Sequence, residues 1–212
     1  RDIHCSLVGS EMCIRDRDDE PDVRAALSML IKSVGLKPEI YESPQAYLDA
    51  YDPSRSGCLV LDMRMPGMSG LDLQVKLAGM GPHPPIIMIS GHGEIPNAVQ
   101  AVQSGAVDFL QKPVNDQLLL DRIQQALRLD VENRRKYNEC HELLSRYDTL
   151  TTREREVMQG VIAGKLNKII ADELSVSTRT VEIHRAHVME KMQAGSLSAL
   201  VNMSNHIEEC KA

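Results

Sequence analysis

The chain has 212 residues, of which 42% are hydrophobic and 25% are charged, with a formal net charge of −6. This length suits two domains of ordinary size, and the composition is typical of a globular protein. No apolar stretch approaches the roughly 18 residues that a membrane span requires, so we expect no membrane partner. The acidic excess lies within residues 1–130, and residues 131–212 are balanced in charge, which argues against indiscriminate binding of nucleic acid but leaves a local basic surface open.

The first 17 residues, RDIHCSLVGSEMCIRDR, have neither the apolar core nor the cleavage site of a secretion signal, so we expect a cytoplasmic protein. The cysteines are widely spaced, with no CxxC pair and no histidine at the spacing of a zinc site. We therefore expect reduced thiols at all five positions, which are Cys5, Cys13, Cys58, Cys140 and Cys210.

From residue 21 to about 129, helical periods alternate with short apolar runs, which predicts an α/β domain with a parallel sheet. The runs CLVLD at 58–62 and PIIMIS at 85–90 are continuously apolar, as expected for strands covered by helices on both faces. Ser43 and Gly105 suit the start and the end of helices. A first strand should occupy residues 12–17, although only three apolar residues precede the charged residues there.

Residues 130–148 are polar and free of glycine and proline, which predicts a helical linker. This linker is either a solvated spacer or a helix that helps to pair two chains.

An all-helical segment follows over residues 149–212. Thr151 and Glu154 have the spacing of a capping box, and Gly164 should end the helix that they open. Asn167 and Ser177 are expected to cap the next two helices, which are joined by the short turn LSVS.

Polar residues gather at the predicted carboxyl ends of the strands, where ligands bind in open parallel sheets. Asp62, Ser90 and Lys112 each end or follow a strand, and Asp18 and Asp19 follow the expected first strand. Each residue alone is common at a turn. Together, acids, a hydroxyl and an amine at four strand ends indicate a site that transfers a phosphoryl group to a carboxylate. Asp62 is then the nucleophile, and Mg²⁺ would be bound by carboxylates.

The segments LVLDMRMPGMSGLDL and MISGHGEIPNAVQAVQSGAVDFLQKPV, with the acidic cluster, resemble the receiver domain of two-component response regulators over residues 18–129. The resemblance implies a doubly wound, flavodoxin-like fold with a five-stranded parallel sheet. It also implies that Asp62 is phosphorylated by a partner histidine kinase, with Ser90 and Lys112 contacting the phosphoryl oxygens.

Further roles follow from the same resemblance. Mg²⁺ would be held by Asp18, Asp19, Asp62 and the backbone carbonyl of Arg64. Phe109 would act as an aromatic switch, although it could equally be a core residue. The Lys112-Pro113 peptide would be cis.

The two helices joined by LSVS have the arrangement of a helix-turn-helix, whose second helix enters the major groove of DNA. Their near balance of charge would also suit a helical bundle that binds a protein. The segment from residue 149 to about 207 nevertheless resembles the LuxR-type DNA-binding domain. The residues that this likeness places near DNA are Lys168, Thr178, Arg179, Thr180, Glu182, Ile183, His184, Arg185, Ala186 and Lys191.

Within this set we expect two roles. Glu182, Ile183 and Ala186 should face the bases. The residues expected to contact phosphates are Lys168, Thr180, His184, Arg185 and Lys191. His187 and Met189 are expected to pack or cap.

The whole chain is identified as a member of the FixJ/NarL group of response regulators. The group implies a transcription factor rather than an enzyme, which dimerises on phosphorylation and binds promoter DNA, with RNA polymerase as a further partner. One alternative is a constitutive DNA-binding regulator with a vestigial receiver. Another is a phosphotransfer enzyme, for which neither a second general base nor a nucleotide-binding loop is visible.

Residues 1–17 do not fit this resemblance, because the central strand of a receiver is apolar. Arg15, Asp16 and Arg17 would bring three charges into or beside that position. We interpret residues 1–17 as a leader that is not native, arising from a sequence joint or a frame error.

Overall fold

The computed structural model describes the backbone of residues 11–15, 21–41, 43–63, 65, 67–91 and 95–211. Contacts of the chain divide it into two compact units, Arg1–Arg134 and Arg135–Ala212. One helix, α5 (Asp116–Asp148), runs from the first unit into the second. The last helix of the α/β unit and the predicted linker are therefore one continuous helix.

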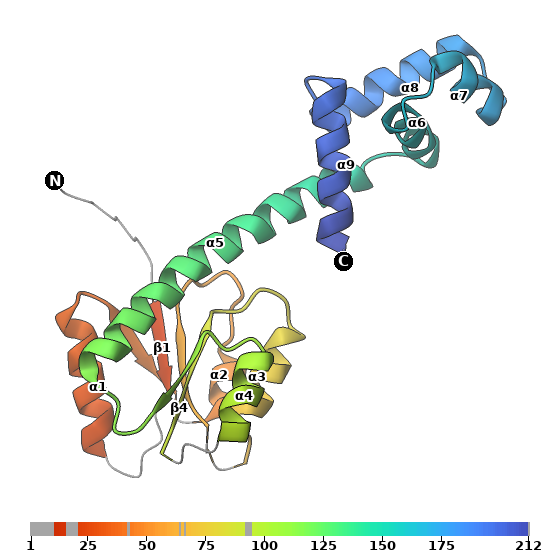
Figure 1. Ribbon diagram of the computed structural model, residues 1–212. Coiled ribbons are helices and arrows are strands. Elements are labelled where there is room, and N and C mark those ends of the chain that lie inside the picture. The colour runs from red at the N-terminus through yellow and green to blue at the C-terminus, as the bar shows by residue number, and fades with distance from the viewer. Residues whose placement is uncertain are drawn as a thin grey trace. The chain divides into compact units, whose positions relative to one another are not determined.

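The N-terminal unit is built on a parallel sheet of five strands in the order β2-β1-β3-β4-β5 (Figure 1). The strands are β1 (Glu11–Arg15), β2 (Lys37–Ile40), β3 (Leu59–Asp62), β4 (Ile86–Ser90) and β5 (Asp108–Gln111). Every pairing is parallel, so the carboxyl ends of all five strands lie at one edge of the sheet. The predicted doubly wound α/β fold is confirmed.

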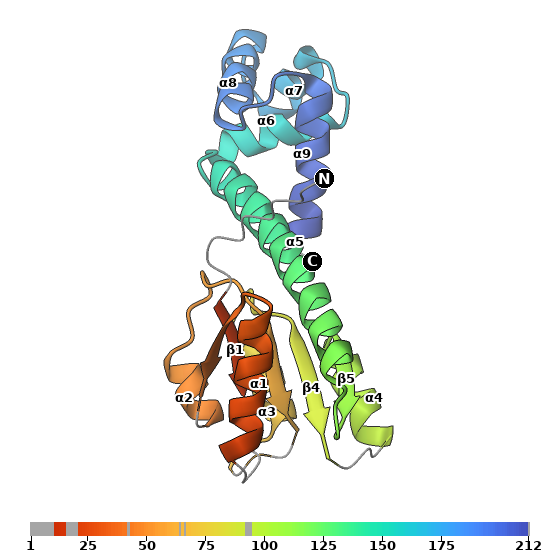
Figure 2. The same ribbon diagram turned by 90° about the vertical axis from the view of Figure 1, so that its left-hand side faces the viewer.

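Helices cover both faces of this sheet (Figure 2). On one face, α1 (Pro21–Ser33) and the first half of α5 pack through Ile31, Ile123 and Leu127 onto alternate residues of β3 and β4. The other face is covered by α2 (Pro44–Asp49), α3 (Gly70–Ala78) and α4 (Ile95–Gln103). All residues of β3 and β4 are buried, which accounts for their continuously apolar sequences.

The expected first strand forms, one residue earlier than predicted. Residues 11–15 make up β1, and their backbones pair with both β2 and β3, so β1 is an interior strand of the sheet. Residues 16 and 17 of the prediction lie outside the described residues.

Two of the predicted helix boundaries in the N-terminal unit are confirmed. The Ser43 hydroxyl accepts a hydrogen bond from the backbone N–H of Ala46 at the start of α2. Gly105 follows α4 with a φ of 94°, a left-handed conformation that glycine adopts without steric cost.

The C-terminal unit contains α6 (Thr152–Ile162), α7 (Asn167–Leu174), α8 (Thr178–Lys191) and α9 (Leu197–Lys211), together with the end of α5. Their core includes Val157, Ile170, Val181 and Leu200. The side chains of Thr151 and Glu154 make the predicted capping box, and Ser177 caps α8.

The prediction that Asn167 caps α7 is wrong. Leu166 holds the N-cap position without a side-chain hydrogen bond, and Asn167 is the first helical residue. The Asn167 side chain instead accepts a hydrogen bond from Arg185 on α8, so it is committed to the contact between the two helices.

The expectation of reduced thiols at every cysteine is also wrong. Cys140 on α5 and Cys210 on α9 form a disulfide, although 70 positions separate them in the sequence. Spacing gave no sign of this pair, because the packing of α9 against the end of α5 is a tertiary contact. Cys58, in contrast, is buried and is not part of a disulfide.

Among the residues that the structure describes, none of the helices is both long enough and apolar enough to span a bilayer.

Candidate functional site

The first candidate site lies at the carboxyl edge of the sheet, where β3, β4 and β5 end side by side. Asp62 is the last residue of β3, Ser90 is the last of β4, and Lys112 directly follows β5. The register pairs Asp62 with Ile89 and Ser90 with Gln111, so the three residues lie on neighbouring strands with an offset of one residue from each strand to the next. Parallel pairing therefore assembles this site from positions 50 residues apart.

An ion pair joins the two outer members of the site. The Lys112 ammonium donates a hydrogen bond to the Asp62 carboxylate, with 2.9 Å between Nζ and Oδ2. The Asp62 side chain is 9% exposed and the Lys112 side chain 23%. Removing two charges from water is costly unless they are paired, so Lys112 compensates the buried charge of Asp62.

Ser90 lies between these strand ends and is 1% exposed. Phe109 is partly buried and packs against the core on the face that α2, α3 and α4 cover. The Lys112-Pro113 peptide bond is cis, as predicted.

A glycine that the sequence analysis missed closes one side of the site. A Cβ placed on Gly70, the first residue of α3, would lie 2.6 Å from the backbone carbonyl oxygen of Asp62. Only glycine allows the start of α3 to approach β3 this closely. The glycine-rich stretch PGMSG at residues 66–70 was the available signal, although it did not reveal which glycine makes the contact.

Part of the predicted metal site cannot be placed. Asp18, Asp19 and the backbone carbonyl of Arg64 lie outside the described residues. The described part of the chain contributes Asp62, a buried carboxylate with the oxygen donors that Mg²⁺ prefers. Asp62 is therefore a suitable ligand for Mg²⁺.

The second candidate site is the outer face of α8. Val181 and Val188 are buried in the core of the C-terminal unit, which turns the opposite face of the helix outward. All three residues predicted to face bases, Glu182, Ile183 and Ala186, are exposed on it. Arg179 and Glu182 form an exposed ion pair of 3.3 Å.

Thr178 and Arg179, which the resemblance places near DNA without a more specific role, are exposed. The residues predicted to contact phosphates fall into two groups, of which the first is the exposed Lys168. Others already have partners within the unit: the Thr180 hydroxyl lies 2.8 Å from that of Ser177, and Arg185 donates to Asn167.

His184 is partly buried, and its Nδ1 atom has no hydrogen-bond partner among the described residues. His187 is about half exposed, with Nδ1 3.6 Å from the Glu154 carboxylate. Met189 packs against the core as predicted.

Lys191 makes the strongest of these internal contacts. Its ammonium lies 2.6 Å from the carboxylate of Glu154, which is 3% exposed. Burial raises the pKa of Glu154, but hydrogen bonds from Lys191 and Thr151 outweigh it and lower the pKa from 4.5 to about 2. Lys191 thus stabilises the fold of the C-terminal unit through the capping box of α6.

Family models match both units. Residues 17–124 match the response regulator receiver domain, and residues 148–204 match the bacterial regulatory proteins of the luxR family. The first match contains the site at Asp62, and the second contains α8.

Curated relatives are similar to this chain over most of their length. The response regulator protein TmoT of Ectopseudomonas mendocina is 43% identical over 192 residues, covering 91% of this chain and 87% of the relative. The transcriptional regulatory protein FixJ of Bradyrhizobium diazoefficiens is 41% identical over 187 residues, covering 88% of this chain and 91% of FixJ.

Among solved structures, that of the response regulator StyR is 40% identical, with a TM-score of 0.80 over 92% of this chain and 99% of StyR. Full-length FixJ from B. japonicum is 39% identical, with a TM-score of 0.55 over 94% of this chain and 98% of FixJ.

Proposed function

Because the chain belongs to the response-regulator family, with a receiver domain followed by a LuxR-type DNA-binding domain, we propose that phosphorylation of Asp62 controls its binding to DNA. The observation that carries this proposal is the 2.9 Å ion pair between Lys112 and Asp62 at adjoining strand ends. A buried carboxylate beside an ammonium is suited to accept a phosphoryl group and to balance its charge.

The chemistry assigns a role to each residue. An Asp62 oxygen attacks the phosphorus of a phosphohistidine on the partner kinase, forming a P–O bond as the P–N bond breaks. Lys112 then transfers its contact from the carboxylate to a phosphoryl oxygen, and the Ser90 hydroxyl donates to another. Mg²⁺, held by Asp62 with Asp18, Asp19 and the Arg64 carbonyl, would neutralise charge on the phosphoryl oxygens.

Phosphorylation adds nearly two negative charges at the edge of the sheet. Drawing Ser90 toward the phosphoryl group gives Phe109 room to move inward, and the surface of α4, β5 and α5 changes with it. We propose that this change favours a homodimer in the cytoplasm whose paired α8 helices read promoter DNA, with RNA polymerase as a further partner.

On the DNA, two kinds of contact are proposed. Lys168, Thr178 and Arg179 would meet phosphates, which makes binding sensitive to salt. Glu182, Ile183 and Ala186 would face bases in the major groove. Arg185 and Thr180 would contact phosphates while keeping their hydrogen bonds to Asn167 and Ser177.

The experiment is phosphorylation by a small phosphoryl donor, such as acetyl phosphate, in the presence of Mg²⁺. We expect the intact mass of the chain to rise by one phosphoryl group, and Asp62→Asn to abolish the rise. Asp116→Asn removes an exposed carboxylate at the start of α5 and should behave like the parent chain. Equal labelling of the parent and Asp62→Asn would refute the assignment.

A further inference from the structure

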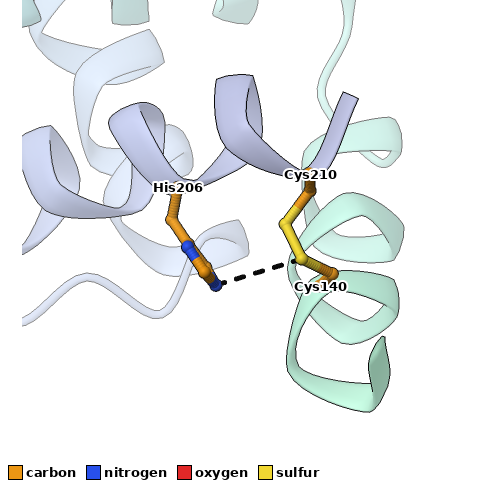
Figure 3. Close-up of side chains that lie close together, drawn as sticks. All are labelled: Cys140, His206 and Cys210. Atoms are coloured by element: carbon orange, nitrogen blue, oxygen red, sulfur yellow. Dashed lines mark hydrogen bonds between the residues drawn. A yellow bond between two sulfur atoms is a disulfide. The ribbon is translucent and has the colours of Figure 1, made fainter. Parts of the chain in front are cut away.

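A cluster of sulfur and nitrogen ligands lies in the C-terminal unit, away from α8. Cys140 comes from α5, whereas His206 and Cys210 lie one helical turn apart on α9 and share a face (Figure 3). All three residues are partly buried, and their ligand atoms lie within 4.8 Å of one another. The receiver chemistry and the binding of DNA use none of them.

The imidazole of His206 is oriented as a metal ligand would be. Its Nε2 atom points toward the sulfur of Cys140 at 4.0 Å, and its Nδ1 atom lies 3.1 Å from the Glu209 carboxylate. A carboxylate on the second nitrogen fixes the tautomer and leaves the first nitrogen free to bind a metal, which is the usual arrangement around zinc. The Glu209 side chain is 75% exposed, so this contact itself contributes little to stability.

The spacing of the three atoms suits a tetrahedral ion. Bonds of about 2.3 Å from zinc to sulfur and about 2.0 Å to nitrogen place tetrahedral ligand atoms roughly 3.5 to 3.8 Å apart. The Cys140 sulfur and the His206 nitrogen are already separated by 4.0 Å. Rotation of the cysteine side chains would separate the two sulfurs once the bond between them is broken.

We propose that Cys140, His206 and Cys210 form a redox-controlled binding site for a divalent ion of the zinc class. A cellular dithiol reduces the disulfide, giving two cysteine thiols and the oxidised dithiol, so two electrons and two protons are transferred. The two thiols then release two protons as they bind the ion, the neutral imidazole supplies the third ligand, and water completes the tetrahedron.

The site couples the oxidation state of the protein to the attachment of its last helix. The disulfide and the metal both tie the end of α9 to α5, whereas the reduced, metal-free form leaves this connection open. Bound metal also holds both sulfurs as ligands, so it competes with their oxidation to the disulfide.

The test uses the full chain, reduced and then freed of reductant without oxygen. Equilibrium dialysis against Zn²⁺ should give one more bound ion per chain for the parent than for Cys140→Ser. Replacing Zn²⁺ with Co²⁺ should produce the visible bands of a tetrahedral ion and a sulfur-to-metal charge-transfer band. Oxidation to the disulfide should abolish both signals.

Variants separate the ligands from the surrounding residues. His206→Gln should lower the affinity for Zn²⁺ more than Glu209→Gln, for which we expect a loss of about 10-fold. His141→Gln is the matched control, because His141 is an exposed histidine that directly follows Cys140 on α5 and is not part of the cluster. It should bind Zn²⁺ like the parent.

A second measurement needs no substitution. Zn²⁺ should slow the alkylation of Cys140 and Cys210 in the reduced parent chain, as followed by peptide mass spectrometry, without changing that of the buried Cys58. The proposal is overturned if Zn²⁺ protects neither cysteine, or if the parent, Cys140→Ser and His206→Gln bind Zn²⁺ equally. Either result would leave this pair as a disulfide only.

Discussion

Each unit of the protein contains a lysine paired with a buried carboxylate, and the surroundings of the two pairs differ. In the N-terminal unit, Lys112 lies 2.9 Å from Asp62, where three strands end. In the C-terminal unit, Lys191 lies 2.6 Å from Glu154, whose carboxylate also accepts a hydrogen bond from the backbone N–H of Thr151. Asp62 ends a strand at the carboxyl edge of the sheet, whereas Glu154 lies in the first turn of a helix.

The difference shows that an ion pair does not identify a functional site by itself. The carboxylate of Glu154 accepts a hydrogen bond from the backbone N–H of Thr151, which would otherwise be left unpaired at the start of α6, so its charge stabilises the fold. Asp62 lies at the end of a strand rather than in the first turn of a helix, and this position suits chemistry with a ligand. Disruption of the Lys112–Asp62 pair should therefore affect phosphorylation, whereas disruption of the Lys191–Glu154 pair should affect the stability of the C-terminal unit.

The largest effect should come from Lys112→Ala. We expect the rate of phosphorylation by acetyl phosphate to fall about 100-fold or more, because one fixed donor to the transferred group is lost. Lys76→Ala removes an exposed lysine from α3 of the same unit and should leave the rate unchanged. An unchanged rate in Lys112→Ala would indicate that the Lys112–Asp62 pair is structural, like the Lys191–Glu154 pair of the C-terminal unit.

Gly70→Ala tests the packing that supports Asp62. The new methyl group would meet the Asp62 carbonyl oxygen at 2.6 Å, and backbone cannot rotate away as a side chain can. We expect the free energy of unfolding in urea to fall by about 2 to 3 kcal/mol. Gly79 follows the same helix with a φ of −84°, and a Cβ added there would make only ordinary contacts. Gly79→Ala should therefore change the free energy of unfolding little. Equal stabilities of the two variants would contradict the close approach.

Glu154→Gln tests the structural pair. Glutamine keeps the capping hydrogen bond but removes the charge, so we expect the C-terminal unit to lose about 1 to 3 kcal/mol of stability at neutral pH. The pKa of Glu154 is lowered to about 2 in the folded state from 4.5. The advantage of the parent should therefore be complete above about pH 4.5 and shrink as the pH falls toward 2.

Thermal unfolding of both proteins over this range of pH provides the measurement. A difference that stayed constant down to pH 2 would show that the charge of Glu154 is not the cause.

The smallest effect should come from Lys168→Ala. Removal of one phosphate contact should weaken binding to all DNA sequences a few-fold and reduce the salt slope by about one. Arg135→Ala removes the same charge from α5, where Arg135 pairs with Glu139, and should change neither quantity. A loss of sequence preference in Lys168→Ala would mean that this lysine reads bases.

The sequence predicted the sheet, its strand ends and the meeting of Asp62, Ser90 and Lys112, because parallel strands bring their carboxyl ends to one edge. Local rules also predicted the caps at Ser43, Thr151 and Ser177. Contacts between distant helices could not be predicted in this way. The disulfide between Cys140 and Cys210 and the ion pair of Lys191 with Glu154 depend on how α5, α6, α8 and α9 pack.

The central claim is that the state of Asp62 controls binding to DNA. Its most direct test measures DNA affinity and molecular mass with and without Mg²⁺ and beryllofluoride, a phosphoryl analogue, using a fragment enriched from a random-sequence pool. In the parent chain, we predict that the analogue raises the affinity about 10-fold and doubles the mass, and that Asp62→Asn responds in neither measurement. Unchanged affinity and mass in every condition would contradict the claim and indicate a constitutive DNA-binding regulator.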